Sequence, residues 1–303
     1  MEQMIREQAY RQVVGVLPPR LRQEAFSLPL QDQCRAEELR LRVGQPMSAV
    51  FPEGERPLGG EPVRAGELEQ LVEIASRASV HAVLDQLRRG YLTVEGGHRI
   101  GLCGTAVLRE GEIHSLRQLS SAVIRVARQV RNASDPVLGR LCPGGKLVST
   151  LILAPPGAGK TTLLRDLVRR VSDGDGCQPR RVSLMDERGE VAALYSGCPQ
   201  LDVGSRTDVM EGCPKARGLM LLMRAMNPQV LAVDEITAPE DVAALRTAAG
   251  CGVTLLATAH GNSREDLERR PLYRALMEAG IFQKLLLIRR EGAGRSYQIE
   301  ELG

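Results

Sequence analysis

Apolar and polar positions in the first part of the chain predict a mixed domain of short strands and helices. Residues 38–43 alternate with period two, so they predict a strand whose arginines share one face. Those arginines fit either a solvated face or a functional role. Residues 66–89 carry apolar side chains at helical spacing and predict two helices. Residues 90–108 predict two strands joined by a glycine hairpin.

Prolines and glycines set the borders of this part. Prolines break residues 1–30 into short helices, and residues 51–66 form a Pro/Gly-rich loop. Residues 132–145 are the expected linker. We therefore expect an N-terminal α+β domain over 1–135 and a C-terminal α/β domain over 136–303.

The second part repeats one pattern, an apolar run that ends in polar groups. Leu147–Leu153 predicts a buried strand, and after a Pro/Gly turn Thr161–Val171 predicts an amphipathic helix. Further strands are predicted at 181–185, 230–233 and 254–259, with a helix at 215–226 and a closing hairpin at 282–288 and 296–300. Alternating strands and helices favour a parallel sheet.

The turn after the first of these strands has the composition of a phosphate-binding loop, and strand, glycine turn and helix occur in the required order. Gly157 and Gly159 allow backbone N–H groups to converge on an anion, Lys160 reaches the β- and γ-phosphates, and Thr161 offers a hydroxyl to Mg²⁺. The alternative is a chance strand–turn–helix with a surface lysine. The residues expected to bind nucleotide are Pro155, Pro156, Gly157, Ala158, Gly159, Lys160, Thr161 and Thr162.

One position departs from the usual loop, because Ala154 stands where the first glycine is expected. That residue ends the strand rather than cradling phosphate. A methyl group is tolerated there if the backbone φ stays negative.

The run at 230–233 leads directly into Asp234 and Glu235. Two adjacent carboxylates at a buried strand end are costly without a cation or hydrogen bonds. Mg²⁺ held by Thr161 and Asp234, with Glu235 polarising the attacking water, resolves that cost, and the alternative is an exposed strand end. This pattern predicts a Walker B site in a hydrolytic enzyme.

Two other strand ends carry candidate chemistry. Asp186 and Glu187 follow one strand, where ligands of open parallel sheets bind, although an ordinary polar strand end is the alternative. Thr258 or His260 is placed to sense the γ-phosphate, and the alternative is a structural histidine. Residues 197–209 contain many turn formers and predict an active-site or subunit-contact loop.

Composition narrows the choice of partners. The 303 residues suffice for two domains, and the net charge of +3 neither requires nor excludes nucleic acid. Seven cysteines without a C-x-x-C pair favour a reduced, cytoplasmic protein without zinc or a disulfide framework. Aromatic content is 3% with no tryptophan, so stacking platforms for single-stranded nucleic acid are scarce.

No apolar run approaches the roughly 18 residues that span a bilayer, and the N-terminus lacks the features of a signal or transit peptide. Any membrane contact is therefore expected to be peripheral.

Taken together, these motifs resemble the stage III sporulation protein AA family over nearly the whole chain. The matching segments are 38–44, 90–101, 155–166, 186–188, 202–214, 234–236 and 258–261. The family in turn resembles the hexameric traffic ATPases of type II and type IV secretion. The resemblance implies a RecA-like P-loop NTPase domain with a smaller N-terminal α+β domain, ATP and Mg²⁺ as ligands, and a homo-hexamer.

The resemblance also assigns residues and a biological task. It implies that Asp186 and Glu187 form an acidic box that aids hydrolysis, and that His260 belongs to a histidine box. It implies that an arginine of the N-terminal domain helps to bind the phosphates, for which the candidates are Arg99, Arg117 and Arg125. The motor would act from the mother-cell cytoplasm on membrane-anchored proteins of a channel between mother cell and forespore. Thr237 and Ala238 replace the family's usual Gly-Arg, which weakens any role at that point.

Our interpretation is an Mg-dependent ATPase in which Lys160, Glu235, Glu187 and His260 act on the phosphate, and Arg206 of a neighbouring subunit completes the site. One rival is a nucleic-acid-stimulated P-loop translocase, which salt-dependent DNA binding would favour. A second rival is a scaffold that binds ATP without hydrolysing it. Equal turnover of the wild type and Glu235→Gln would support that scaffold.

Overall fold

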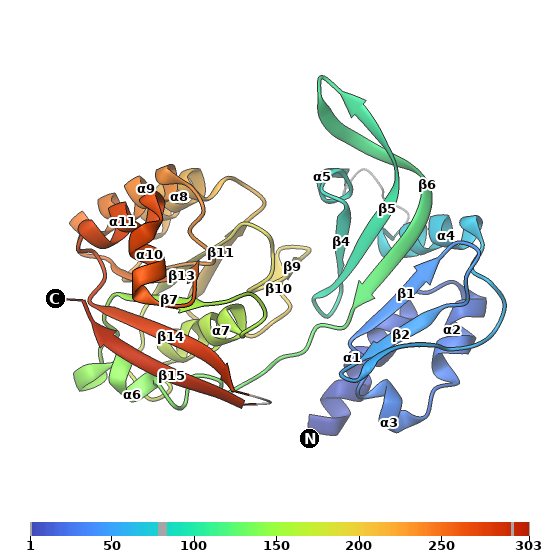
Figure 1. The fold of residues 1–303 in the computed structure, drawn as a ribbon, viewed down its shortest axis with the longest axis horizontal. Coiled ribbons are helices and arrows are strands. Elements are labelled where there is room, and N and C mark those ends of the chain that lie inside the picture. The colour runs from blue at the N-terminus through green and yellow to red at the C-terminus, as the bar shows by residue number, and fades with distance from the viewer. Residues whose placement is uncertain (1, 78–83, 292–293, 303) are drawn as a thin grey trace. The chain divides into compact units, whose positions relative to one another are not determined.

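The chain forms two units in the computed structural model, which describes residues 2–77, 84–291 and 294–302. Residues 1–128 and 193–200 make up the N-terminal unit, and residues 129–192 and 201–303 make up the C-terminal unit. In Figure 1 the chain runs from blue in the N-terminal unit to red at the carboxyl end of the C-terminal unit. No helix within the described residues combines the length and the apolar character needed to cross a bilayer.

A six-stranded sheet and a set of short helices form the N-terminal unit. Its helices are α1 (Glu2–Gly15), α2 (Pro19–Phe26), α3 (Leu30–Gln33), α4 (Ala65–Ala75) and α5 (Leu84–Arg88). Its strands are β1 (Glu38–Arg42), β2 (Ser48–Phe51), β3 (Gly54–Pro57), β4 (Tyr91–Val94), β5 (His98–Arg109) and β6 (Glu112–Arg125), in the sheet order β3-β2-β1-β6-β5-β4. Every pairing in this sheet is antiparallel.

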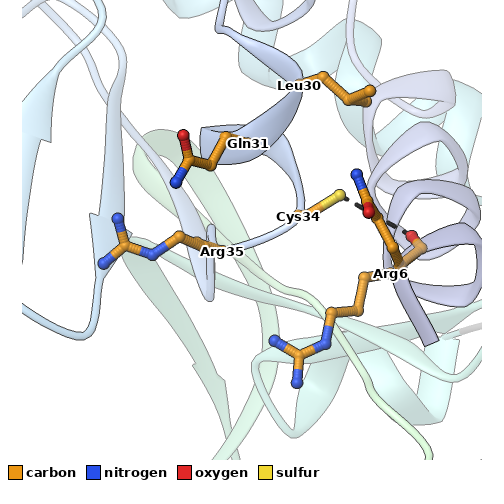
Figure 2. Close-up of a pocket in the computed structure, with 6 residues that line it drawn as sticks. Arg6, Leu30, Gln31, Cys34 and Arg35 are labelled. Atoms are coloured by element: carbon orange, nitrogen blue, oxygen red, sulfur yellow. Dashed lines mark hydrogen bonds between the residues drawn. The ribbon is translucent and has the colours of Figure 1, made fainter.

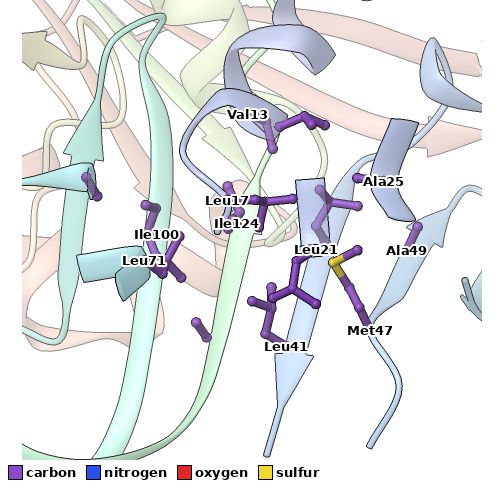
Figure 3. Close-up of a cluster of buried hydrophobic side chains, with 14 of the residues drawn as sticks. Val13, Leu17, Leu21, Ala25, Leu41, Met47, Ala49, Leu71, Ile100 and Ile124 are labelled. Atoms are coloured by element: carbon purple, nitrogen blue, oxygen red, sulfur yellow. The ribbon is translucent and has the colours of Figure 1, made fainter. Parts of the chain in front are cut away.

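One face of that sheet carries the core. Leu39 and Leu41 of β1 are fully buried, while the polar residues between them are half-buried, as the period-two pattern predicts. Leu41 and Ile124 pack with Val13 and Leu21 of the helices, so the helices cover this face (Figure 3). The opposite face carries the arginines of β1.

A short hairpin from later in the chain completes the N-terminal unit. Strands β9 (Leu194–Tyr195) and β10 (Cys198–Pro199) pair with each other. The backbone N–H of Gly96 donates to Oε1 of Gln200 at 2.8 Å, and the Arg77 guanidinium lies 5.2 Å from the centre of the Tyr195 ring. These contacts explain why residues 193–200 belong with a sheet from which they are about one hundred residues distant in sequence.

The C-terminal unit is a sheet with helices on both faces. Its helices are α6 (Leu138–Leu141), α7 (Lys160–Asp173), α8 (Lys215–Met226), α9 (Pro239–Gly250), α10 (Arg264–Arg269) and α11 (Pro271–Glu278). Its strands are β7 (Thr150–Ala154), β8 (Val182–Asp186), β11 (Thr207–Glu211), β12 (Val230–Val233), β13 (Thr254–His260), β14 (Lys284–Glu291) and β15 (Gly294–Glu301).

Parallel pairing aligns the motif-bearing strand ends. The sheet order is β11-β8-β12-β13-β7-β14-β15, and all pairs except β14–β15 are parallel. Val233 pairs with both Met185 and Ala257, and His260 pairs with Ala154. The carboxyl ends of β8, β12, β13 and β7 therefore lie next to each other along one edge. The cluster on one face contains residues of α8, α9 and α11, and α7 packs against the other face (Figure 1).

Some observed elements differ from the sequence expectations, and part of one expected stretch cannot be compared. Strands β2 and β3 form a hairpin that extends into the expected loop at 51–66, helices α9 to α11 were not expected, and residues 78–83 of the expected helical stretch lie outside the described residues. The boundary between the units falls after residue 128 rather than after 135. Backbone N–H groups of Asn132 and Ser134 donate to the buried carboxylate of Asp166 on α7, which fixes that segment to the C-terminal unit.

Candidate nucleotide site

The loop between β7 and α7 has the backbone that phosphate binding requires. Gly157 and Gly159 have φ angles of +72° and +98°, in the left-handed region that side chains disfavour. Gly159 directly precedes the first residue of α7, so the free N–H groups of the first turn face the loop. Ala154 is the last residue of β7 and has extended backbone, so its methyl group meets the condition that a non-glycine residue needs there.

Lys160 lies against the strand ends. Its ammonium donates to the carbonyl of Ala154 at 3.2 Å and to Nδ1 of His260 at 2.8 Å. Burial lowers the pKa of Lys160 from its ordinary value of 10.5, and the charges of Asp234 and Glu235 oppose that shift. The lysine is thus directed at the same strand ends that carry the candidate carboxylates.

His260 connects Lys160 to Glu235, the second residue after β12. An ammonium group has no acceptor, so Nδ1 of His260 must accept from Lys160 and the ring proton lies on Nε2. Nε2 is 3.1 Å from Oε1 of Glu235 and donates to it. The three side chains form one hydrogen-bonded chain, Lys160–His260–Glu235, from three separate elements of the fold. Arg188 approaches the other oxygen of Glu235 at 3.9 Å, a weak ion pair.

Asp234 has the surroundings of a carboxylate that meets a cation. Its Oδ2 accepts from Oγ1 of Thr161 at 3.1 Å, and its Oδ1 accepts from Oγ1 of Thr258 at 2.8 Å. Burial raises the pKa of Asp234 above its ordinary value of 3.8, and the two threonine hydrogen bonds oppose the shift. Within the described residues no cluster of three or more His, Cys, Asp or Glu forms a metal cage. Mg²⁺ commonly binds through one or two protein oxygens plus substrate phosphates, so Asp234 and Thr161 fit this cation.

Thr258 organises both carboxylates that follow β12, those of Asp234 and Glu235. Its hydroxyl donates to Asp234 and accepts the backbone N–H of Glu235 at 2.8 Å, and the side chain is fully buried. Glu235 has a φ of +54°, a left-handed conformation that costs a non-glycine residue about 1–3 kcal/mol and persists only where its surroundings enforce it. Strain of this kind concentrates at functional sites. Of the two candidates on β13, His260 lies beside the lysine and Thr258 supports the carboxylates.

The acidic pair at the end of β8 divides into two roles. Asp186 accepts backbone N–H bonds from Glu190, Val191 and Ala192 at 2.9, 3.0 and 2.8 Å, so it folds its own loop. Burial raises the pKa of Asp186, and these N–H groups oppose the shift. Glu187 instead lines a small pocket.

That pocket gathers the acidic groups of the site. Its lining residues are Asp186, Glu187, Arg188, Glu190, Lys215, Asp234 and Glu235. Five of these side chains are carboxylates and two are cations. Among these groups, Glu187 forms an ion pair with Lys215 at 2.7 Å.

Sequence reasoning missed two residues here. Arg165 of α7 is buried and donates to the carbonyls of Val191 and Glu190 at 2.5 and 2.7 Å, so it fixes the loop after Asp186. Burial lowers its pKa, against the charge of Asp186. Lys215 is the other. A cation in the first turn of a predicted helix opposes the helix dipole, and that conflict is the signal that could have identified it.

The remaining predicted residues lie elsewhere. The Arg206 guanidinium donates to the carbonyl of Ser172 at 2.9 Å, near the end of α7 opposite the phosphate loop, so it is not part of its own chain's site. Its role towards a neighbouring subunit stays a prediction. Arg99 and Arg125 belong to the N-terminal unit, where Arg99 lies 3.7 Å from the centre of the Tyr91 ring. The roles implied for these arginines and for Arg117 also stay predictions.

A different surface hollow lies in the N-terminal unit. Figure 2 shows Arg6, Arg35 and Cys34 around it, with the Cys34 thiol 3.8 Å from the carbonyl of Gln3. The residues that line it include neither a carboxylate nor a glycine loop. This hollow lacks the groups that nucleotide hydrolysis needs.

Comparison with known proteins agrees with this geometry. The chain is 38% identical over 296 residues to stage III sporulation protein AA of Bacillus subtilis (strain 168), which covers 95% of this chain and 94% of that protein. The pilus retraction motor PilT with bound ADP superposes with a TM-score of 0.63 at 18% identity, over 93% of this chain and 82% of PilT. The ATPase DotB of Yersinia pseudotuberculosis gives 0.61 at 14% identity, over 94% and 80%.

The two structural likenesses confirm the expected fold class, a RecA-like P-loop domain with a smaller N-terminal α+β domain. The family is shown by sequence. A model described as sporulation stage III, protein AA matches residues 7–300. With the Bacillus subtilis relative, that match confirms the resemblance inferred from the motifs: the chain belongs to the stage III sporulation protein AA family.

Proposed function

We propose that the chain is an Mg-dependent ATPase that acts as a hexamer in the cytoplasm and energises a membrane-anchored channel between mother cell and forespore. The observation that carries the enzymatic part is the hydrogen-bonded chain Lys160–His260–Glu235, which lies beside a glycine loop and a buried aspartate. The family name and the likeness to secretion and pilus motors support the biological part.

The residues divide the chemistry between binding and water activation. Lys160 and the backbone N–H groups of 157–162 stabilise negative charge on the transferring phosphoryl group. When bound, Mg²⁺ neutralises charge on the β- and γ-phosphates, and Thr161 and Asp234 are the residues that would hold it. Glu235 orients the attacking water, helped by Glu187, while His260 fixes the carboxylate of Glu235 and the ammonium of Lys160 relative to each other.

Entry of ATP changes the partners of Lys160. Its ammonium donates to His260 and to the Ala154 and Pro155 carbonyls. A γ-phosphate offers a charged acceptor and competes with these neutral ones. His260 then keeps its Nε2 bond to Glu235 and has an Nδ1 acceptor available for another donor.

Phosphate release from ATP in the presence of Mg²⁺ tests the enzymatic part. Lys160→Ala and Glu235→Gln should each lower turnover by about 10²-fold or more. The matched controls are Lys146→Ala and Glu278→Gln, which change exposed side chains away from the strand ends and should keep wild-type turnover. Undiminished hydrolysis by Lys160→Ala, or equal turnover of wild type and Glu235→Gln, contradicts the mechanism.

The biological part needs a cellular experiment. Glu235→Gln should hold ATP without splitting it, so a tagged variant expressed in sporulating cells should retain membrane partners that the wild type releases. Recovery of the same proteins by Lys160→Ala, which lacks the phosphate contact, would show that docking does not depend on nucleotide. Stimulation of the ATPase by DNA would favour the rival translocase instead.

A further inference from the structure

Lys215 lies in an unusual position for a lysine. It is the first residue of α8, and its side chain is only 5% exposed. The positive end of the helix dipole repels an ammonium at that position, and burial of a charge without a partner costs several kcal/mol. A lysine in this place therefore needs a specific anion.

That anion is Glu187. Nζ of Lys215 donates to Oε2 of Glu187 at 2.7 Å, across 28 residues of sequence. The side chain of Glu187 is 36% exposed, so one part of the carboxylate is held by the buried lysine while the rest stays accessible to the pocket. The pair joins the first turn of α8 to the carboxyl end of β8.

Close packing fixes α8 against β8 just beyond this pair. Gly218 lies one turn after Lys215, and a Cβ at that position would come within 2.2 Å of Sδ of Met185 and 3.0 Å of Sγ of Cys213. Only glycine permits this approach without a shift of its neighbours. Because Met185 directly precedes Asp186 and Glu187, the ammonium is held relative to the end of β8 by packing as well as by charge.

The pocket itself supplies the reason for a cation. Glu187 shares its walls with Asp186, Glu190, Asp234 and Glu235, and like charges in a confined space repel one another. Arg188 is the other cation, and its side chain is 64% exposed with a 3.9 Å approach to Glu235. Lys215 is the buried one, and it faces Glu187.

We infer that Lys215 is a positioning residue for ATP hydrolysis, which holds the Glu187 carboxylate in the acidic pocket beside Glu235, where both orient the attacking water. This inference rests on the proposed ATPase function and extends it by one residue. It predicts that loss of Lys215 acts through Glu187, on turnover rather than on nucleotide affinity. Displacement of a water-orienting group by about 1 Å costs on the order of 10²-fold in rate.

A double-mutant cycle with phosphate release and ATP-analogue binding tests it. Lys215→Met should lower kcat about 10- to 100-fold and leave the Kd for the analogue within about twofold. Lys215→Arg should recover most of the turnover, because the guanidinium also pairs with a carboxylate. In a Glu187→Gln background, Lys215→Met should cause at most about a further twofold loss. Arg217→Gln, two residues along the same helix and exposed, is the matched control with unchanged kinetics.

The outcomes separate this inference from the function on which it rests. If the wild type hydrolyses no ATP, the proposed function fails and the inference fails with it. If the wild type is active and Glu235→Gln is slow, but Lys215→Met turns over normally or its loss multiplies with that of Glu187→Gln, only the inference is overturned. Should Lys215→Met fail to fold, the double variant removes both charges and leaves none unpaired, and its turnover should equal that of Glu187→Gln alone.

Discussion

Replacement of Thr258 by valine tests whether one hydroxyl maintains the geometry of both Asp234 and Glu235. Valine keeps the shape of threonine and removes the group that donates to Asp234 and accepts from the backbone of Glu235, each at 2.8 Å. A lost hydrogen bond to a charged group costs about 1.5–3 kcal/mol, and an unsatisfied buried N–H costs about 1–3 kcal/mol. We expect the free energy of unfolding to fall by about 3 kcal/mol.

Turnover should fall even under conditions where the variant remains folded, so the loss of activity is larger than unfolding alone would cause. The hydroxyl anchors the backbone N–H of Glu235, whose φ of +54° relaxes readily once that anchor is gone. A shift of about 1 Å in the Glu235 carboxylate lowers kcat on the order of 10²-fold. Thr258→Ser keeps the hydroxyl, loses one methyl group worth about 0.8 kcal/mol, and should keep most of the turnover.

The assay combines urea unfolding with steady-state ATP hydrolysis below the unfolding transition. Thr258→Val that unfolds at the wild-type urea concentration and hydrolyses at the wild-type rate would show that neither hydrogen bond matters. A valine variant that is destabilised but fully active would confine the role of the hydroxyl to folding. Either result refutes the link from Thr258 to the position of Glu235.

Three further predictions concern the loop, the linker and the N-terminal unit. Gly159→Ala, which places a Cβ at φ +98°, should abolish ATP-analogue binding, measured by fluorescence titration, and unchanged affinity would show that the loop tolerates another backbone. Asp166→Ala leaves the backbone N–H and hydroxyl of Ser134 without their acceptor. It should lower the free energy of unfolding, measured by urea denaturation, by about 2–4 kcal/mol, and an unchanged value would show that the linker is held by other contacts. His98 is fully buried, burial lowers its pKa from 6.5 to about 4, and its Nδ1 accepts the backbone N–H of Ala127. The folded state therefore binds this proton more weakly than the unfolded state, so the stability that the neutral ring contributes is complete above pH 6.5 and falls, by at most about 3 kcal/mol, as pH drops towards 4. His98→Gln should flatten that part of the curve of stability against pH, and an unchanged slope would contradict the assignment.

The site was predictable where chemistry is adjacent in sequence to a buried strand. Lys160, Asp234 and His260 each follow an apolar run, and parallel pairing brings such ends together without further information. Asp186 ends β8 and Glu187 follows it, as the strand pattern predicts, but the different contacts of the two side chains were not visible in the sequence. Asp186 accepts from its own loop, a matter of backbone conformation that the residue types do not specify.

What escaped prediction depends on contacts distant in sequence. Lys215 and Glu187 meet because Gly218 lets α8 approach β8, and no local pattern encodes that approach. Strand β3 was hidden by prolines and glycines at 51–66 because it lies at the edge of its sheet with four exposed residues, where apolar alternation is not required. The left-handed backbone of Glu235 is likewise imposed by the fold around it.

The hairpin at 193–200 has a consequence for how the chain can be divided. The N-terminal unit takes Tyr195 and Gln200 from a segment that lies between two strands of the seven-stranded sheet. A gene rearrangement that moved residues 1–128 alone would leave the N–H of Gly96 and the side chain of Arg77 without these contacts. Residues 1–128 are therefore an incomplete unit, and the N-terminal unit is whole only when the chain continues through residue 200.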